Sequence, residues 1–261
     1  MFKYLCVILK VGYYIIWCYF SFMRKYAKHP EKYPLNERWR RYQKLVRKIL
    51  WAFNVRLEVK NLHLIQTRAP QFIVGNHLSM MDPLILIAIS QKPLVFVAKK
   101  ETAKFPFIGK ALMGLDGLFL ERRALKQEVK IMLQVRAFIA EEKRTVVMFP
   151  EGTRSKSFHL PVATFKPGSF KYALETETPI VPFASVGQQF ILSGKLNWKS
   201  HPVFVKFANP ITFKKGEIDT IKASAYFRDQ VQTLVDETKE KYLLTMENLP
   251  LKKFSRWALN E

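Results

Sequence analysis

The stretch QFIVGNHLSMMDP, residues 71–83, places a histidine and an aspartate directly after a short apolar run. The apolar residues predict a buried strand, and Gly75 and Pro83 predict a turn before the helix that follows. On one continuous helix a five-residue step would rotate His77 and Asp82 about 140° apart, so their side chains can meet only across such a turn. The order of strand, polar turn and helix is typical of an α/β fold, whose ligand sites lie beyond the carboxyl ends of the strands.

A purely structural interpretation of Asp82 also fits this stretch. Aspartate followed by proline at the start of an apolar run is a frequent helix N-cap, with the proline in the first helical position. A His and an Asp five residues apart are weak evidence for catalysis by themselves, because short patterns often occur by chance. The rest of the chain therefore has to decide between a catalytic pair and a helix cap.

Outward from this stretch, short apolar runs alternate with longer helix-like segments from residue 54 onward. Strands are predicted at 56–60, 72–74, 94–98, 118–120, 145–149, 180–185 and 203–207. Helices are predicted at 83–90, 124–142, 170–177 and 223–246. A chain of 261 residues is long enough for one such domain with an N-terminal appendage. We therefore expect a single α/β domain over residues 54–261 with a mostly parallel central sheet.

Residues 1–53 are predicted to form a helical segment that attaches the chain to a membrane. The apolar run 4–23 approaches the roughly 20 residues that cross a bilayer, but Lys10 interrupts it and its many Tyr and Trp residues suit a shallow insertion equally well. The segment 35–53 predicts a helix with one apolar and one basic face, which indicates either adhesion to an anionic bilayer or docking on the domain core. The basic residues of that helix are Arg38, Arg40, Arg41, Lys44, Arg47 and Lys48.

The chain carries 43 Lys and Arg against 21 Asp and Glu, a net charge of +22 that indicates an anionic partner. In a nucleic-acid-binding protein the aromatic residues would interleave with the basic ones, whereas here they form a separate apolar run. We therefore expect an anionic phospholipid membrane and no nucleic acid. Cys6 and Cys18 both fall in the apolar run, so no disulfide framework is expected and a cytoplasmic setting is the default.

Three further elements stand beside predicted strands. Counting residues 71–83 as the first element, the second is FPEGTRS at residues 149–155. There Arg154 offers a planar guanidinium suited to phosphate, and Glu151 could orient Arg154 or hold a substrate hydroxyl. An incidental surface ion pair is the alternative. The third is GLFLER at 117–122, a predicted strand followed by the cationic residue Arg122. The fourth is IVPF at 180–183, which can line an acyl pocket but more often would be plain core.

These four elements, in this order, resemble the 1-acyl-sn-glycerol-3-phosphate acyltransferase family, within the glycerolipid acyltransferases that share a His-x4-Asp motif. The resemblance covers about residues 55–210, and the short chain is similar to bacterial members. One departure is the Leu-Ser-Met-Met between His77 and Asp82, where many members carry Ser or Gln with Trp or Leu. The resemblance implies that His77 is the catalytic base and Asp82 its orienting partner. It implies that the acceptor is bound by Lys99, with Lys100 as a rival, and by Gly117, Phe119, Arg122, Glu151, Gly152, Thr153 and Arg154, with Val181 and Pro182 in the acyl pocket.

The implied reaction moves a fatty acyl group from an acyl thioester, acyl-ACP or acyl-CoA, to the sn-2 hydroxyl of lysophosphatidic acid, giving phosphatidic acid at the cytoplasmic face of the cell membrane. A histidine can take the acceptor's proton while a carboxylate orients the ring, so direct transfer without an acyl-enzyme is expected. No metal-ligand spacing and no Gly-rich nucleotide loop is present, so we expect no metal and no bound cofactor. The alternatives are another acceptor, such as glycerol 3-phosphate or a different lysolipid, a basic nucleic-acid-binding protein, and a catalytically silent membrane scaffold.

Overall fold

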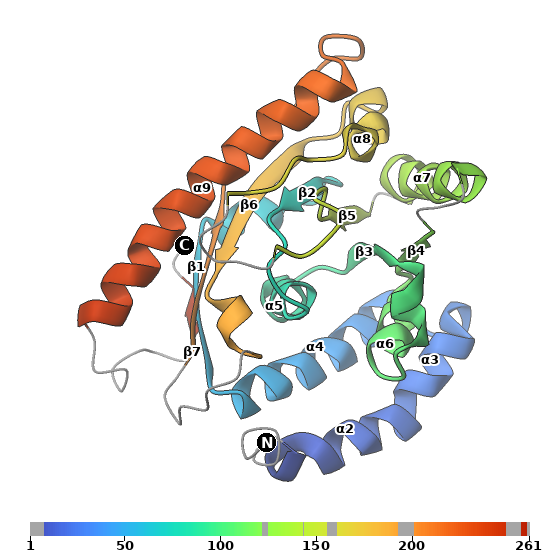
Figure 1. Ribbon diagram of the computed structural model, residues 1–261. Helices are drawn as coiled ribbons and strands as arrows, with labels where there is room; N and C mark the ends of the chain where they lie inside the picture. The colour runs from blue at the N-terminus through green and yellow to red at the C-terminus, as the bar shows by residue number, and fades with distance from the viewer. Residues whose placement is uncertain are drawn as a thin grey trace.

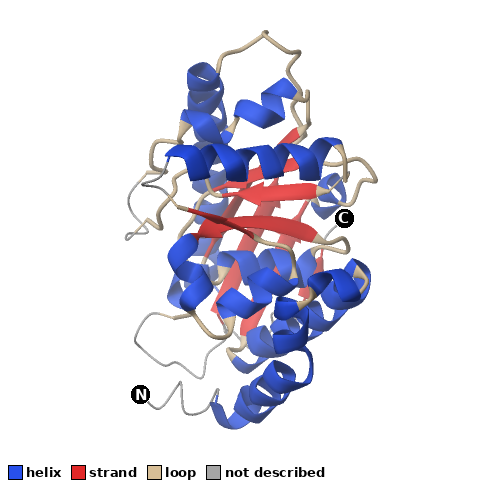
Figure 2. Cartoon of the chain, turned by 90° about the vertical axis from the view of Figure 1, so that its right-hand side faces the viewer, coloured by secondary structure: helices blue, strands red, loops and turns tan. Residues whose placement is uncertain are grey.

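The centre of the protein is an eight-stranded sheet in the order β4-β3-β5-β2-β6-β7-β1-β8 (Figures 1 and 2). The computed structural model describes residues 8–121, 125–142, 144–155, 161–192, 201–248 and 257–259. The strands are β1 Val55–Lys60, β2 Phe72–Gly75, β3 Leu94–Lys99, β4 Leu118–Leu120, β5 Thr145–Met148, β6 Ile180–Val186, β7 His201–Phe207 and β8 Trp257–Leu259.

Neighbouring strands of this sheet are parallel except for β6 and β7, which pair antiparallel. The seven strands predicted from the sequence are confirmed to within two residues, and β8 was not predicted. The strands β2, β5 and β6 are buried along their whole length. Near-continuous apolar runs are typical of parallel strands that are covered on both faces. The parallel pairing brings the carboxyl ends of β2, β3, β4 and β5 to one edge of the sheet.

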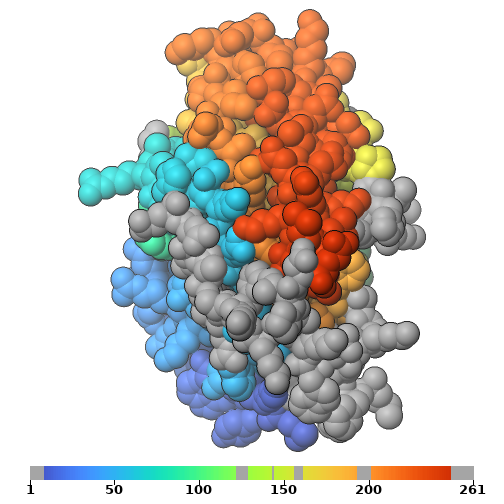
Figure 3. Space-filling view, turned by 90° about the vertical axis from the view of Figure 1, so that its left-hand side faces the viewer, coloured from blue at the N-terminus to red at the C-terminus, as the bar shows by residue number. Residues whose placement is uncertain are grey.

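Helices cover both faces of the sheet, each over its own apolar cluster (Figures 1 and 2). One face carries α4 Leu35–Ala52, α5 Asp82–Ile89 and α6 Ile108–Gly114. The other face carries α7 Leu125–Ala140, α8 Lys171–Glu175 and the long α9 Thr220–Asn248, and Figure 3 shows α9 along the outside of the molecule above the N-terminal helices. The four predicted helices are confirmed, whereas α6, a short helix with a glycine near each end, was not predicted.

The described N-terminal residues pack on the α/β domain as helices. The described part of the apolar run is helical, with α2 Tyr13–Cys18 and α3 Arg24–Lys28, and Figure 1 shows both beside α4 and α6. Phe22 and Tyr26 belong to the same apolar cluster as α4 and α5. Among the described residues, no helix combines the length and the apolar character needed to cross a bilayer. The boundary at residue 53 stays a prediction.

The predicted amphipathic helix is present as α4, and its apolar face is docked on the core through Trp39, Tyr42, Val46 and Leu50. The prediction that Arg38 lies on the basic solvent face is wrong, because its side chain is buried. On the same helix, Gln43 Nε2 donates to Ser90 O at 2.6 Å and Arg47 Nε donates to Ala88 O at 2.9 Å. These donors satisfy carbonyls at the end of α5 that have no partner within that helix.

Candidate active site

The first and second sequence elements meet at the carboxyl edge of the sheet. Strand β2 leads into the loop that carries His77, and the neighbouring strand β5 leads into the loop of residues 149–155. The two loops are joined by a hydrogen bond from Ser155 N to His77 O at 2.8 Å. The structure therefore brings the backbone around His77 and the backbone next to Arg154 into direct contact.

His77 and Asp82 are hydrogen bonded, with 2.7 Å between Nδ1 and Oδ2. The turn that the sequence predicted between them is present. The same carboxylate oxygen accepts from Leu78 N at 2.9 Å and from Ser79 N at 3.0 Å, and the Asp82 side chain is fully buried. The helix N-cap interpretation is wrong, because no side chain caps α5 and the Asp82 carboxylate accepts from the loop before the helix.

The geometry assigns the two ring nitrogens of His77 different roles. Since Asp82 Oδ2 already accepts two backbone N–H groups, it acts as an acceptor toward Nδ1 as well, so in the neutral ring Nδ1 carries the proton and Nε2 the lone pair. The ring stacks on Phe149 with 4.4 Å between centroids, and 21% of the side chain is exposed. The imidazole is thus held by a carboxylate on one edge and an aromatic ring on one face, and part of the ring stays exposed.

Glu151 connects three segments around the site. Its Oε1 accepts from His77 N at 2.7 Å, and its Oε2 accepts from Ala163 N at 3.2 Å. The side chain is buried, and this burial raises the pKa of Glu151, while the two backbone hydrogen bonds oppose the shift. The interpretation that Glu151 orients Arg154 is wrong, because the carboxylate faces the two backbone groups instead.

Asn76 also holds the loop after β2, and the sequence analysis missed it. Its Nδ2 donates to Ser185 O and its Oδ1 accepts from Ser185 N, both at 2.9 Å. This pair of bonds fastens the loop to the end of β6. The sequence feature that could have revealed Asn76 is an amide side chain next to a predicted buried strand, since a buried Asn needs partners for both its donor and its acceptor.

Of the other predicted acceptor-binding residues, Thr153, Arg154 and Lys99 lie at the same edge, whereas Gly117 precedes β4 and so lies at the opposite edge. Thr153 and Arg154 are exposed, and the Arg154 guanidinium makes no hydrogen bond or ion pair with any residue in the described part of the chain. Lys99 is exposed at the end of β3, whereas its rival Lys100 forms an ion pair with Glu121 at 2.7 Å. The remaining positions are Gly117 at the entry to β4, Phe119 within β4, Gly152 beside Glu151, and Arg122, which lies outside the described residues.

The two predicted acyl-pocket residues are not at the edge of the sheet. Val181 and Pro182 are buried within β6, and Val181 belongs to the apolar cluster beneath α4 and α5. A cavity does lie beside the site, on the side of α9, and its lining is mostly apolar. It is lined by Asn76, Leu78, Glu151, Ser155, Pro161, Val162, Val186, Val235 and Lys239. The acyl-pocket assignment and the absence of a cofactor stay predictions.

Comparisons with known proteins agree with this architecture. The family model described as Acyltransferase matches residues 56–186, which is half of the chain. A 1-acyl-sn-glycerol-3-phosphate acyltransferase of Borreliella burgdorferi is 28% identical over 199 residues, 76% of each chain. A probable 1-acyl-sn-glycerol-3-phosphate acyltransferase of Mycoplasma pneumoniae is 29% identical over 226 residues, 80% of this chain and 83% of the relative.

A solved structure has the same fold over nearly the whole chain. The crystal structure of the 1-acyl-sn-glycerophosphate acyltransferase PlsC from Thermotoga maritima matches with a TM-score of 0.63 and 26% identity, covering 91% of this chain and 93% of that chain. The mostly parallel sheet, the His-Asp pair at its carboxyl edge and the match over residues 56–186 lead to one assignment. This chain belongs to the acyltransferase family.

Proposed function

We propose that this protein transfers a fatty acyl group from an acyl thioester to the free sn-2 hydroxyl of 1-acyl-sn-glycerol 3-phosphate, giving phosphatidic acid. The observation that carries the proposal is the partly exposed His77 imidazole, bonded to Asp82 through Nδ1, beside the loop of Arg154. The names of the relatives in Borreliella burgdorferi and Mycoplasma pneumoniae support the choice of acceptor.

The proposed chemistry needs a base and little else from the protein, because a thioester is already an activated acyl donor. His77 Nε2 takes the proton of the acceptor hydroxyl as the oxygen attacks the thioester carbonyl. The carboxylate of Asp82 stabilises the imidazolium that forms and keeps the ring in the required tautomer. The C–S bond then breaks and the imidazolium returns its proton to the sulfur, so that acyl carrier protein or coenzyme A leaves as a free thiol. Both carriers are anionic and complement the net charge of +22.

The test of the proposed function is an acyl-transfer assay with purified protein. A labelled acyl thioester is offered with lysophosphatidic acid, with glycerol 3-phosphate and with other lysolipids in parallel. We expect phosphatidic acid as the main product. Acylation of glycerol 3-phosphate alone, or no transfer to any acceptor, would contradict the proposal.

Arg154 is proposed to bind the acceptor's phosphate with its planar guanidinium. Replacing Arg154 with Lys keeps the charge but removes the two parallel hydrogen bonds that the fork can form. We expect the KM for lysophosphatidic acid to rise about tenfold, equivalent to about 1.4 kcal/mol, with little change in kcat. Steady-state kinetics with varied acceptor measures this. The matched control is Arg68→Lys, at an exposed arginine that precedes β2 at the opposite edge of the sheet. If both variants had the same KM for lysophosphatidic acid, Arg154 would not bind the phosphate.

The N-terminal helices are proposed to bind the bilayer interface from the cytoplasmic side. Tyr13 is 84%, Trp17 50% and Phe20 60% exposed, and Phe105 and Phe107 of the loop before α6 are exposed as well. Arg24 lies over the Phe20 ring at 5.6 Å. Exposed aromatic rings beside cationic side chains are suited to the headgroup region of an anionic membrane.

A sedimentation assay with anionic phospholipid vesicles tests this interface. The double variant Trp17→Ala/Phe20→Ala is expected to weaken binding by at least about tenfold, because burial of one large aromatic side chain contributes about 1.5–3 kcal/mol. The control is Ile221→Ala, which removes a side chain of 70% exposure on α9. Undiminished vesicle binding by the double variant would show that the membrane contact lies elsewhere.

A further inference from the structure

One face of the His77 ring is covered by an aromatic side chain that the proposed chemistry does not use. Phe149, the residue after β5, stacks on the imidazole with 4.4 Å between ring centroids and 24° between ring planes. The Asp82 carboxylate lies in a different direction, since it accepts from Nδ1 at the edge of the ring. The imidazole therefore has a negative group at its edge and an aromatic face against its own face.

The position of Phe149 is supported by Phe183 of β6. The two rings meet edge to face, with 6.1 Å between centroids and 71° between ring planes. Phe183 is fully buried and lies against Gly75 at the end of β2, where an added Cβ would overlap the Phe183 ring. The neighbouring strands β5, β2 and β6 thus together build a stack of three rings that ends on His77.

Hydrogen bonds between the two loops also hold the rings together. His77 N donates to Glu151 Oε1 at 2.7 Å, and Ser155 N donates to His77 O at 2.8 Å. The chain turns tightly after Phe149, because Gly152 N donates to Phe149 O at 3.0 Å. The backbone that carries one ring is thus bonded to the loop that carries the other, so the stack does not depend on the ring contact alone.

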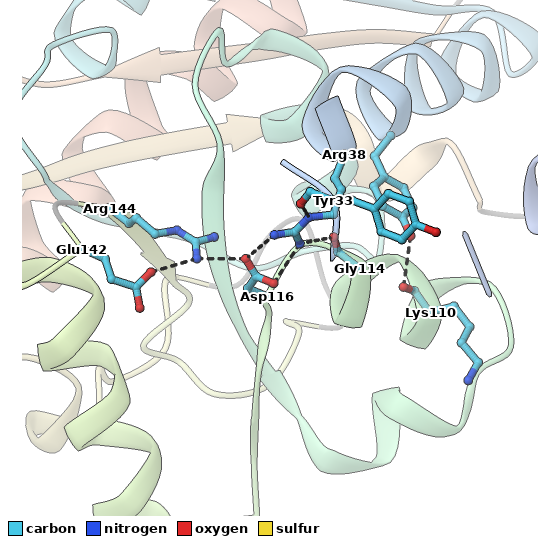
Figure 4. Close-up of polar contacts among 8 residues, drawn as sticks. Tyr33, Arg38, Lys110, Gly114, Asp116, Glu142 and Arg144 are labelled. Carbon is cyan, nitrogen blue, oxygen red and sulfur yellow. Dashed lines mark hydrogen bonds and ion pairs between the residues drawn. The ribbon is translucent and has the colours of Figure 1, made fainter. Parts of the chain in front are cut away.

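The same combination of partners surrounds a permanent cation elsewhere in the protein. Arg144 Nη1 donates to Asp116 Oδ2 at 3.0 Å (Figure 4), and the Arg144 guanidinium lies over the Phe138 ring, 4.6 Å from its centroid. The Arg144 side chain is 10% exposed. A charge that has lost most of its water is stabilised there by a carboxylate and by an aromatic face. His77 has both kinds of partner, but its ring is a cation only after it has taken up a proton.

We propose that Phe149 is a positioning residue whose ring face stabilises the protonated imidazole of His77 during acyl transfer. This inference rests on the proposed function, in which Nε2 takes the proton of the acceptor hydroxyl and returns it to the leaving sulfur. The negative face of an aromatic ring attracts a cation placed over it, more strongly where water is excluded. A neutral imidazole gains less from the same contact, so the ring favours the proton-accepting step over the resting state. Phe149 acts through His77 and needs no contact with either substrate.

The sharpest test changes the charge on the ring face and leaves the shape of the side chain nearly unchanged. Fluorine withdraws electrons from the ring, so monofluoro-, difluoro- and trifluorophenylalanine in place of Phe149 weaken the attraction for a cation stepwise. We expect kcat for transfer to lysophosphatidic acid to fall with each fluorine, by about fivefold in the trifluoro protein. The KM for both substrates should change little, because the contact acts on the proton-accepting step.

Two natural substitutions give the limits of the series. Phe149→Leu keeps an apolar side chain against Phe183 but has no ring face, so we expect kcat to fall about tenfold. Phe149→Tyr keeps the ring face and should retain kcat within about twofold of the wild type. Steady-state kinetics with both substrates varied measures these values, and the thermal unfolding midpoint shows that each variant is folded.

The matched control places the same fluorinated residues at Phe138 of α7, over the permanent cation Arg144. Phe138 packs on the apolar cluster of the other face of the sheet and, like Phe149, is half-buried. Weakening its ring face should lower the thermal unfolding midpoint and leave kcat at the wild-type value. The control therefore separates an effect on the proton-accepting step from the general cost of fluorination.

Two results would overturn the inference. The first is a kcat that stays constant across the fluorinated series at Phe149; beside an impaired Phe149→Leu, it would reduce the ring to packing. The second is a raised KM with unchanged kcat, which would place Phe149 in contact with a substrate. His77→Ala, measured in parallel, keeps the two proposals apart: retained kcat in that variant refutes the base itself. If the wild type acylates another acceptor, the choice of lysophosphatidic acid fails, and the same series with that acceptor still decides the role of Phe149.

Discussion

Replacing His77 with alanine is expected to lower kcat by about 10³-fold or more, because proton removal by a positioned base contributes on the order of 10²- to 10⁴-fold to such reactions. The loss should appear in kcat, since the imidazole acts as the acceptor hydroxyl attacks, and the KM for the acyl thioester should change little. The measurement is steady-state transfer of a labelled acyl group at saturating acceptor.

The controls for this variant are structural. His63 lies exposed in the short helical turn Leu62–Ile65, so His63→Ala should retain wild-type turnover. The His77→Ala protein should also keep its thermal unfolding midpoint within a few degrees, which excludes misfolding as the cause. A folded His77→Ala protein with more than a tenth of wild-type kcat would exclude His77 as the base.

The Asp82→Asn variant is expected to lose activity on the order of 10³- to 10⁴-fold, the scale of a tautomer change in a His-carboxylate pair. Asp82 Oδ2 accepts from His77 Nδ1, Leu78 N and Ser79 N. An asparagine that keeps its oxygen at this position still accepts from Nδ1 but carries no charge to stabilise the imidazolium, and its amide group takes the buried position of Oδ1, where it has no hydrogen-bond partner. If the amide group takes the Oδ2 position instead, the two backbone N–H groups lose their acceptor, the ring proton moves to Nε2, and the base is lost.

Kinetics of Asp82→Asn beside Asp236→Asn, an exposed aspartate of α9, checks this expectation. The control should turn over at the wild-type rate. If Asp82→Asn retained kcat within tenfold of the wild type, the hydrogen bond to Nδ1 would be structural, and the ring orientation would have another source.

The sheet could be predicted from the sequence because parallel strands that are buried on both faces consist of continuous apolar runs, as in residues 72–74 and 180–185. The meeting of His77 and Asp82 was also predictable, because Gly75 and Pro83 mark the turn that it requires. The helix α4 and its apolar face followed from apolar residues at three- and four-residue steps, but the sequence left open whether that face meets the core or a bilayer. Each of these features depends on residues that are close together in the chain.

Contacts across the fold were not predictable in the same way. The partners of Glu151 are backbone N–H groups. Because every residue except proline has such a group, the residue types do not show which ones a carboxylate will bind. Arg38 was assigned to the solvent face by periodicity, but its burial depends on Asp116, 78 residues further along. The edge strand β8, three residues long, was not predicted either.

The most direct test of the account is a structure of the protein with lysophosphatidic acid bound. The account predicts that one acceptor molecule reaches both loops, with its free hydroxyl about 2.6–3.2 Å from His77 Nε2 and its phosphate against the Arg154 guanidinium. A complex in which the phosphate lies away from Arg154 and the hydroxyl is out of reach of His77 would contradict it.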